Sequence, residues 1–314
     1  MLKRMGRAAA WLVMAGLLFL LFRKVPFAAV VTAARGAAAW TLPVGAVGIA
    51  AIYFADSFAI WKTFGWFLAP LSFAQVLVVR GATYLLAAIN YNVGQGAIVY
   101  FVNRATGAPI LRGVATVLLI MGVNVLALLA FATVGLAVAP DLPHSVAVVV
   151  GVAYAGLAVY GLAVWWKPRW LAQRPVFDVL LAAGFGGHAR ALLVRLPHIV
   201  ALVAFQTAML RAFGVAVPLA QAVVALPIVF FIAVLPISVQ GLGTTQAAMV
   251  FFFARYAQGN AEAQKAAVLA ASLFAMALAL TLQTALGLAC LRSRVGRELK
   301  TAAAGAPSPD PSGG

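Results

Sequence analysis

The chain has 314 residues, of which 65% are apolar and only 9% carry a charge. This composition lies outside the range of soluble globular domains and predicts an integral membrane protein. The 22 Lys and Arg residues against 6 Asp and Glu give a formal net charge of +16, which in a soluble protein would indicate a nucleic-acid partner. Here the basic residues stand at the ends of apolar stretches. We therefore expect them to orient helices and to meet anionic lipid head groups, and we expect no nucleic acid.

Seven apolar stretches predict helices that cross the bilayer, since a span takes about 20 apolar residues. They lie near residues 8–22, 41–61, 110–138, 143–166, 196–214, 218–236 and 264–291. Backbone groups in lipid must find hydrogen bonds within their own segment, and the stretches lack the in/out alternation of a β-barrel. The sequence therefore predicts an all-α, polytopic fold with about seven full transmembrane helices.

The first of these stretches follows Lys3, Arg4 and Arg7 and is followed at once by Arg23 and Lys24. A positively charged start before a short apolar run is typical of a signal peptide. Because basic residues flank the run on both sides and the rest of the chain is polytopic, we expect an uncleaved first helix instead.

Clusters of basic residues predict the topology of the chain. They lie at residues 3–7, 167–195 and 292–300. Because loops rich in Lys and Arg stay in the cytoplasm, we expect both termini on the cytoplasmic side of a bacterial inner membrane. Two segments mix charges with small or apolar residues, 25–37 and 174–195, and these predict helices that lie on the membrane surface.

Residues 1–291 form a single predicted membrane domain. The interfacial segment 167–195 divides this domain into parts 1–166 and 196–291, and a basic, Pro/Gly/Ser-rich tail follows over residues 292–314. We expect the tail to be disordered because it has too few apolar residues to build a core. The function is therefore expected within or at the bilayer.

Two further apolar regions, near 73–102 and 238–256, are interrupted by glycines and amides, which predicts broken or re-entrant helices. The first contains NYNVGQGAIVYF at residues 90–101, and the second contains SVQGLGTTQAAMVFFF at residues 238–253. Each then resumes with small residues and aromatics, which suggests an internal repeat in two parts. Paired glycine-broken segments are the sequence feature that best marks the substrate site of a transporter.

The second interruption predicts a helix that stops and restarts. Pro236 removes a backbone donor, and Gly241 and Gly243 permit conformations closed to other residues, so we expect a new helix over about 244–253. The free N–H groups at its start would attract an anion, and we expect the same where a helix resumes after residues 94–96. The alternative is that these glycines only let helices pack closely.

Two charged residues stand inside apolar segments, where a charge is costly unless it is paired or functional. Arg80 is either an interfacial residue or a phosphate-binding one. Asp56 is the only acid inside a predicted span, and it is either the partner of Arg80 or a carboxylate that couples transport to protons.

Metal and cofactor chemistry is not indicated. The three histidines, His144, His188 and His198, fall in loops or at helix ends without ligand spacing, and the single cysteine is Cys290. There is no motif for a nucleotide, a nucleophile or a pair of carboxylates. We therefore expect no metal, no cofactor and no catalytic residue.

At the two interruptions the sequence resembles the transmembrane region of lysylphosphatidylglycerol synthases and related multi-span proteins. Members show asparagine, a few residues, then Pro-Gly-Arg-x-Gly-Glu, which residues 90–97 (NYNVGQGA) match loosely. They also show Leu-Pro-x-x-x-Gly-Gly-x-Gly-x-x-Glu, which residues 235–246 (LPISVQGLGTTQ) match more specifically. The departures remove charge, because Gln95, Ala97 and Gln246 replace charged residues and Asn124 stands where members often carry an acid.

The resemblance implies a role in moving lipids rather than in making them, since the aminoacyl-transfer reaction of the synthases resides in a large soluble domain. We predict a translocator, not an enzyme, whose partners are membrane lipids with anionic phospholipid or polyprenyl-phosphate-linked head groups. The head group would be held between segments 90–97 and 238–246. The expected head-group contacts are Arg80, Asn90, Asn92, Gln95, Asn124, Gln240 and Gln246. The residues expected to shape the backbone are Gly94, Gly96, Pro236, Gly241 and Gly243.

Two other classes of function stay open at this point. The chain could be a membrane-embedded enzyme or accessory subunit that acts on polyprenyl-phosphate or glycolipid substrates, for which Asp56 is the one acid available at depth. It could also be a non-transporting scaffold that lacks the charged site of its relatives. The sequence leaves a homodimer open as well.

Overall fold

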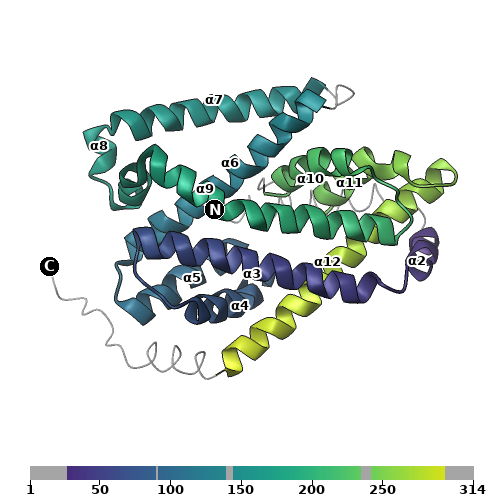
Figure 1. Ribbon diagram of the computed structural model, residues 1–314, viewed down its shortest axis with the longest axis horizontal. Helices are drawn as coiled ribbons and strands as arrows, with labels where there is room; N and C mark the ends of the chain where they lie inside the picture. Colours follow the sequence, from purple (N-terminus) through teal and green to yellow (C-terminus); the bar gives the residue numbers. More distant parts are fainter. Residues whose placement is uncertain (1–26, 90, 139–143, 235–241, 294–314) are drawn as a thin grey trace, which may run out of the picture. The chain divides into compact units, whose positions relative to one another are not determined.

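The computed structural model describes residues 27–89, 91–138, 144–234 and 242–293, and its regular structure there is helical apart from one isolated β-bridge between Val215 and Ala257 (Figure 1). The predicted all-α class is therefore confirmed. The helices are α2 Phe27–Arg35, α3 Thr41–Phe67, α4 Phe73–Ile89, α5 Tyr91–Thr106, α6 Ile110–Val138, α7 His144–Trp166, α8 Arg169–Ala172, α9 Pro175–Ala212, α10 Leu219–Val234, α11 Thr244–Phe253, a 3₁₀ turn Ala254–Tyr256 and α12 Ala261–Arg292.

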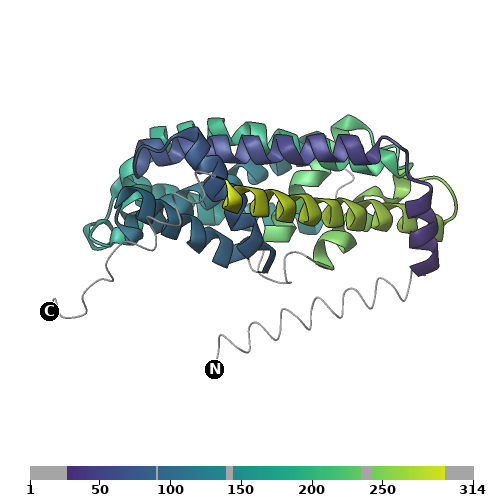
Figure 2. The same ribbon diagram turned by 90° about the horizontal axis from the view of Figure 1, so that it is seen from below.

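Four helices, α3, α6, α9 and α12, are long and apolar enough to cross a membrane. They confirm four of the predicted spans, and α12 is drawn as one uninterrupted helix in Figure 2. Apolar helical stretches of α4 (Phe73–Ala87), α7 (Val150–Trp166) and α10 (Leu219–Ala233) are shorter, with 10–17 residues each. The predicted span 8–22 lies outside the described residues. The chain is thus a membrane protein by its helices, and the count of seven spans stays a prediction.

Helix α9 runs through residue 195, where the sequence predicts a boundary between an interfacial segment and the second part of the chain. It runs from Pro175 to Ala212 and contains Pro197, so no helix ends at the expected boundary. Its one non-helical residue is Gly184, with φ 56° and ψ −174°, a conformation that a glycine adopts without a steric penalty. Proline removes one backbone donor but does not by itself end a helix that its neighbours hold in place. The surface location of 167–195 and the two-part division stay predictions.

The described residues group into two compact units. The first unit takes its residues from Met1–Ala55, Val123–Gly161 and Arg195–Leu282. The second unit takes its residues from Asp56–Gly122, Leu162–Val194 and Gln283–Gly314. Both units receive parts of α3, α6, α7, α9 and α12, because the unit boundaries fall inside these helices.

The second unit has an apolar core built from α3, α4, α5 and α6. Buried residues of this core include Phe64, Val76, Ile98 and Val117. The start of α4 is capped reciprocally, since the Ser72 N–H donates to Gln75 Oε1 at 2.9 Å and the Gln75 N–H donates to Ser72 Oγ at 3.2 Å. Helices α4 and α5 pack directly against each other (Figure 1).

In the first unit, α9 lies close against α3. A Cβ atom added at Gly48 would lie 2.8 Å from the ring of Phe205, so a small residue is needed at this approach. Helices α10 and α11 pack against each other, and the β-bridge of Val215 with Ala257 ties the chain after α9 to the chain after α11. Each unit therefore contains one pair of short helices. The first unit contains α10 and α11, and the second unit contains α4 and α5.

Candidate functional site

A buried ion pair joins α3 to α4 in the second unit. The Nε atom of Arg80 donates to Oδ2 of Asp56 at 2.5 Å, and the two side chains are 11% and 2% exposed. The guanidinium also lies 4.6 Å from the centre of the Tyr84 ring, a cation–π distance. Of the alternatives that the sequence left open for Asp56, the partnership with Arg80 is therefore confirmed.

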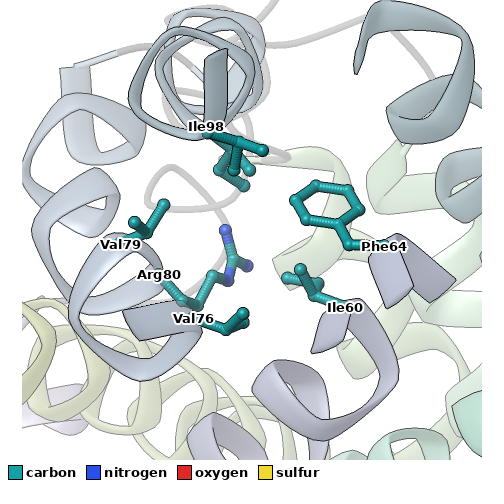
Figure 3. Close-up of a pocket in the computed structure, with 7 residues that line it drawn as sticks. Ile60, Phe64, Val76, Val79, Arg80 and Ile98 are labelled. Carbon is teal, nitrogen blue, oxygen red and sulfur yellow. The ribbon is translucent and has the colours of Figure 1, made fainter. Parts of the chain in front are cut away.

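The guanidinium of Arg80 extends into a narrow cavity that has no room for a water molecule. Figure 3 shows it pointing between the side chains of Ile98 and Phe64. Apart from Arg80, every lining residue is apolar, namely Ile60, Phe64, Val76, Val79, Ile98 and Val102. In such surroundings a charge is stable only beside its counterion, so Asp56 holds the guanidinium in place.

The first interrupted segment is more regular than predicted. Helix α4 ends at Ile89 and α5 begins at Tyr91, so residues 94–96 are helical and the expected restart after them is wrong. Asn90, at the junction itself, lies outside the described residues. Glycine permits a helix break but does not impose one, and neither Gly94 nor Gly96 has a positive φ.

Gly94 serves the packing of α5 on α4. A Cβ atom added there would lie 2.6 Å from the Cβ and 2.9 Å from the Cα of Ala87, whereas at Gly96 it would meet nothing within 4 Å. The close-packing alternative therefore holds for Gly94. In the same helix Asn92 is exposed and Gln95 is half-buried, and their contacts to a head group stay predictions.

The restart of the second interrupted segment is confirmed. Helix α11 begins at Thr244, directly after Gly243 with its φ of 83°. The backbone N–H of Gly243 donates to Oε1 of Gln246 at 2.7 Å, and Gln246 is only 2% exposed. The side-chain oxygen of Gln246 caps the helix, and the expected contact of Gln246 to a head group stays a prediction. Pro236, Gln240 and Gly241 lie outside the described residues.

The substitution Gln246→Ala tests whether Gln246 serves as a helix cap or as a substrate contact. We expect this substitution to lower the free energy of unfolding by about 1–2 kcal/mol, because the buried Gly243 N–H loses its acceptor. Gln75→Ala, which removes an exposed cap of the same kind from α4, should lower it by less. Reversible unfolding in mixed micelles measures the free energy of unfolding of both variants. A Gln246→Ala protein with unchanged stability and lost transport would instead assign Gln246 to the substrate.

Asn124 has an unexpected partner in the first unit. The Nε atom of Arg195 in α9 donates to its Oδ1 atom at 2.9 Å, and Arg195 is buried. One turn later Nδ1 of His198, also buried, lies 3.4 Å from the backbone oxygen of Ile52. In the sequence, Arg195 belongs to the basic cluster 167–195 that is expected to set the topology. Its apolar flanks, LLVR followed by LPHIV, were the same signal that marked Arg80.

Among the described residues there is no group of three or more His, Cys, Asp or Glu that could hold a metal ion. A comparison of the chain with family models and with curated proteins finds no match. The resemblance to the lysylphosphatidylglycerol synthase membrane region thus rests on residues 90–97 and 235–246 alone and stays a prediction.

Proposed function

We propose that this protein translocates a lipid or lipid-linked intermediate with a polar or anionic head group across a bacterial inner membrane. The observation that carries the proposal is the Asp56–Arg80 pair, buried among apolar side chains of membrane-type helices. Charged residues inside membrane helices are rare and mark substrate or ion pathways by default. A guanidinium binds phosphate oxygens through two parallel hydrogen bonds, which suits Arg80 to a phosphate head group.

The short helices support a transport role for the broken segments. In chain order α3, α4, α5 and α6 have 27, 17, 16 and 29 residues; α9, which has 38 residues and is kinked at Gly184, is followed by α10, α11 and α12 with 16, 10 and 32 residues. In each series two short helices stand between two long ones, which favours the two-part internal repeat. Helices as short as α4, α5, α10 or α11 fall below the roughly 20 residues of a span, as expected for the broken helices of a transporter.

In the proposed mechanism, Asp56 and an anionic head group compete for Arg80. With no substrate bound, Asp56 neutralises the guanidinium, and the cavity around it has no room for a water molecule. A head group can reach Arg80 only if α4 and α5 move away from α3 and open this cavity. The lipid tails would remain in the bilayer throughout.

One observation favours the scaffold alternative. Gln246 and Gly94, both expected to serve the substrate, have structural roles as a helix cap and a packing contact. Under the scaffold alternative their substitution changes stability alone. Under the enzyme alternative Asp56→Asn abolishes turnover of a polyprenyl-phosphate substrate, because the only acid at depth is gone.

The deciding experiment measures leaflet-resolved movement of fluorescent phospholipids and polyprenyl-phosphate analogues in proteoliposomes. We expect wild type to speed the movement of anionic lipids, and Asp56→Asn/Arg80→Gln, which removes both charges but keeps a polar side chain at each position, to reduce that rate by about tenfold or more. Arg190→Gln, which removes an exposed charge from α9 in the same unit, should not change it. No movement of any lipid by wild type would exclude an unaided translocator.

A further inference from the structure

The end of α7 carries the greatest concentration of exposed tryptophan among the described residues. Trp165 and Trp166 are the last two residues of α7, and Trp170 belongs to α8, which follows directly in Figure 1. Their side chains are 75%, 82% and 70% exposed. Tryptophan at the end of an apolar membrane helix sits at the level of the lipid head groups, because its ring is amphipathic.

Three exposed basic side chains alternate with these tryptophans. They are Lys167, Arg169 and Arg174, in the segment WWKPRWLAQR at residues 165–174. The first acid after them in the chain is Asp178, so the segment carries three positive charges and no negative one. A basic cluster of this kind attracts anionic lipids in the surface of a membrane.

The segment has a defined conformation. The Lys167 N–H donates to the Ala163 oxygen at 2.9 Å, and Lys167 adopts a φ of 47°, so α7 ends in a left-handed residue just before Pro168. The Gln173 N–H donates to the Arg169 oxygen at 3.0 Å, which closes the turn of α8. The aromatic and basic residues therefore follow one another along a segment with a defined backbone conformation.

An apolar helix surface leads up to this turn. Val159 and Leu162 of α7 are exposed, and the last charged residue before Lys167 is Asp141, outside α7. An exposed apolar helix surface is stable against lipid tails rather than water. The change from aliphatic to aromatic and then to basic side chains follows the change from tails to head groups in a bilayer leaflet.

We propose that residues 165–174 bind anionic phospholipid. Trp165, Trp166 and Trp170 occupy the interfacial layer of the leaflet, and Lys167, Arg169 and Arg174 bind the phosphate groups of the lipids there. This proposal needs a membrane location for the chain but does not depend on translocation, so the two can fail separately.

The test uses quenching of tryptophan fluorescence by brominated lipids in vesicles of phosphatidylglycerol and phosphatidylcholine. The lipid ratio is kept constant, and only the lipid that carries bromine is exchanged. The signal of the three tryptophans is the difference between wild type and Trp165→Phe/Trp166→Phe/Trp170→Phe. We expect brominated phosphatidylglycerol to quench this signal at least about twofold more than brominated phosphatidylcholine.

In Lys167→Gln/Arg169→Gln/Arg174→Gln the quenching ratio should fall close to one. The matched control, Arg35→Gln/Arg255→Gln/Lys265→Gln, removes the same charge where no exposed tryptophan cluster lies and should keep the wild-type ratio. In wild type, added salt should lower the ratio without any substitution, because charge attraction is screened.

Three results would overturn the proposal. Equal quenching by the two brominated lipids in wild type would show that anionic lipid is not selected. An equal loss of selectivity in the control triple variant would show an effect of overall charge rather than of this segment. Absence of quenching by either lipid would show that something other than lipid, such as a second copy of the chain, covers the tryptophans.

Discussion

Asp56→Ala is expected to lower the free energy of unfolding by about 3–5 kcal/mol, because it leaves the Arg80 guanidinium buried without its counterion. Arg80→Ala should cost a similar amount, since it leaves the Asp56 carboxylate at 2% exposure without its cation. Replacing both partners by apolar side chains removes the desolvation penalty along with the attraction. Asp56→Leu/Arg80→Met should therefore lie within about 1 kcal/mol of wild type.

Reversible unfolding in mixed micelles provides the measurement for this cycle, and Arg190→Ala provides its control. Arg190 is exposed in the same unit, so its removal should change the free energy of unfolding by no more than about 0.5 kcal/mol. If Asp56→Ala cost as little as Arg190→Ala, the ion pair would not exist in the folded protein. The apolar double variant also separates stability from function, because it is expected to fold and yet to lack any charge for a head group.

Gly94→Ala and Gly96→Ala are expected to change stability in opposite directions, although the two glycines stand two positions apart in α5. At Gly94 the new methyl group would lie 2.6–3.0 Å from side-chain and backbone atoms of Ala87, so α5 must shift away from α4. Forced overpacking of this kind costs about 1–3 kcal/mol. At Gly96 the methyl group meets no atom within 4 Å, and alanine favours a helix over glycine by up to about 1 kcal/mol.

The comparison of these two variants decides how the first interrupted segment works. The same unfolding assay applied to both variants should rank Gly96→Ala at or above wild type and Gly94→Ala below it. If both lowered transport equally while stability stayed unchanged, the glycines would shape a substrate-binding backbone rather than a packing contact. Leaflet-resolved transport, measured on the same two proteins, provides that readout.

Sequence patterns located the polar positions of the candidate site better than they assigned their roles. Arg80 and Asp56 stood out because a charge among apolar residues needs an explanation wherever the chain folds. Gly243 stood out because it is the last glycine of the interruption that follows Pro236, and α11 begins one residue later. Arg195 did not stand out in this way, because it lies close to other basic residues and was grouped with them.

Features that depend on local composition follow from the amino-acid sequence alone. Apolar length determined the helical membrane class and the four helices that can span, and the Gly243 position determined where α11 restarts. These properties follow from each segment alone, because backbone hydrogen bonds in a helix are satisfied within the helix.

The partner of each polar group, in contrast, depends on how the helices pack in three dimensions. Three contacts depend on which helices become neighbours. They are the ion pair of Asp56 with Arg80, the hydrogen bond of Arg195 to Asn124 and the close approach of α5 to α4 at Gly94. The cap formed by Gln246 spans only the four residues 243–246. It still depends on tertiary packing, because Gln246 is buried where water cannot compete for the Gly243 N–H. Such choices are made by packing, since a charge or amide has many acceptable partners in sequence and only the nearest one in space.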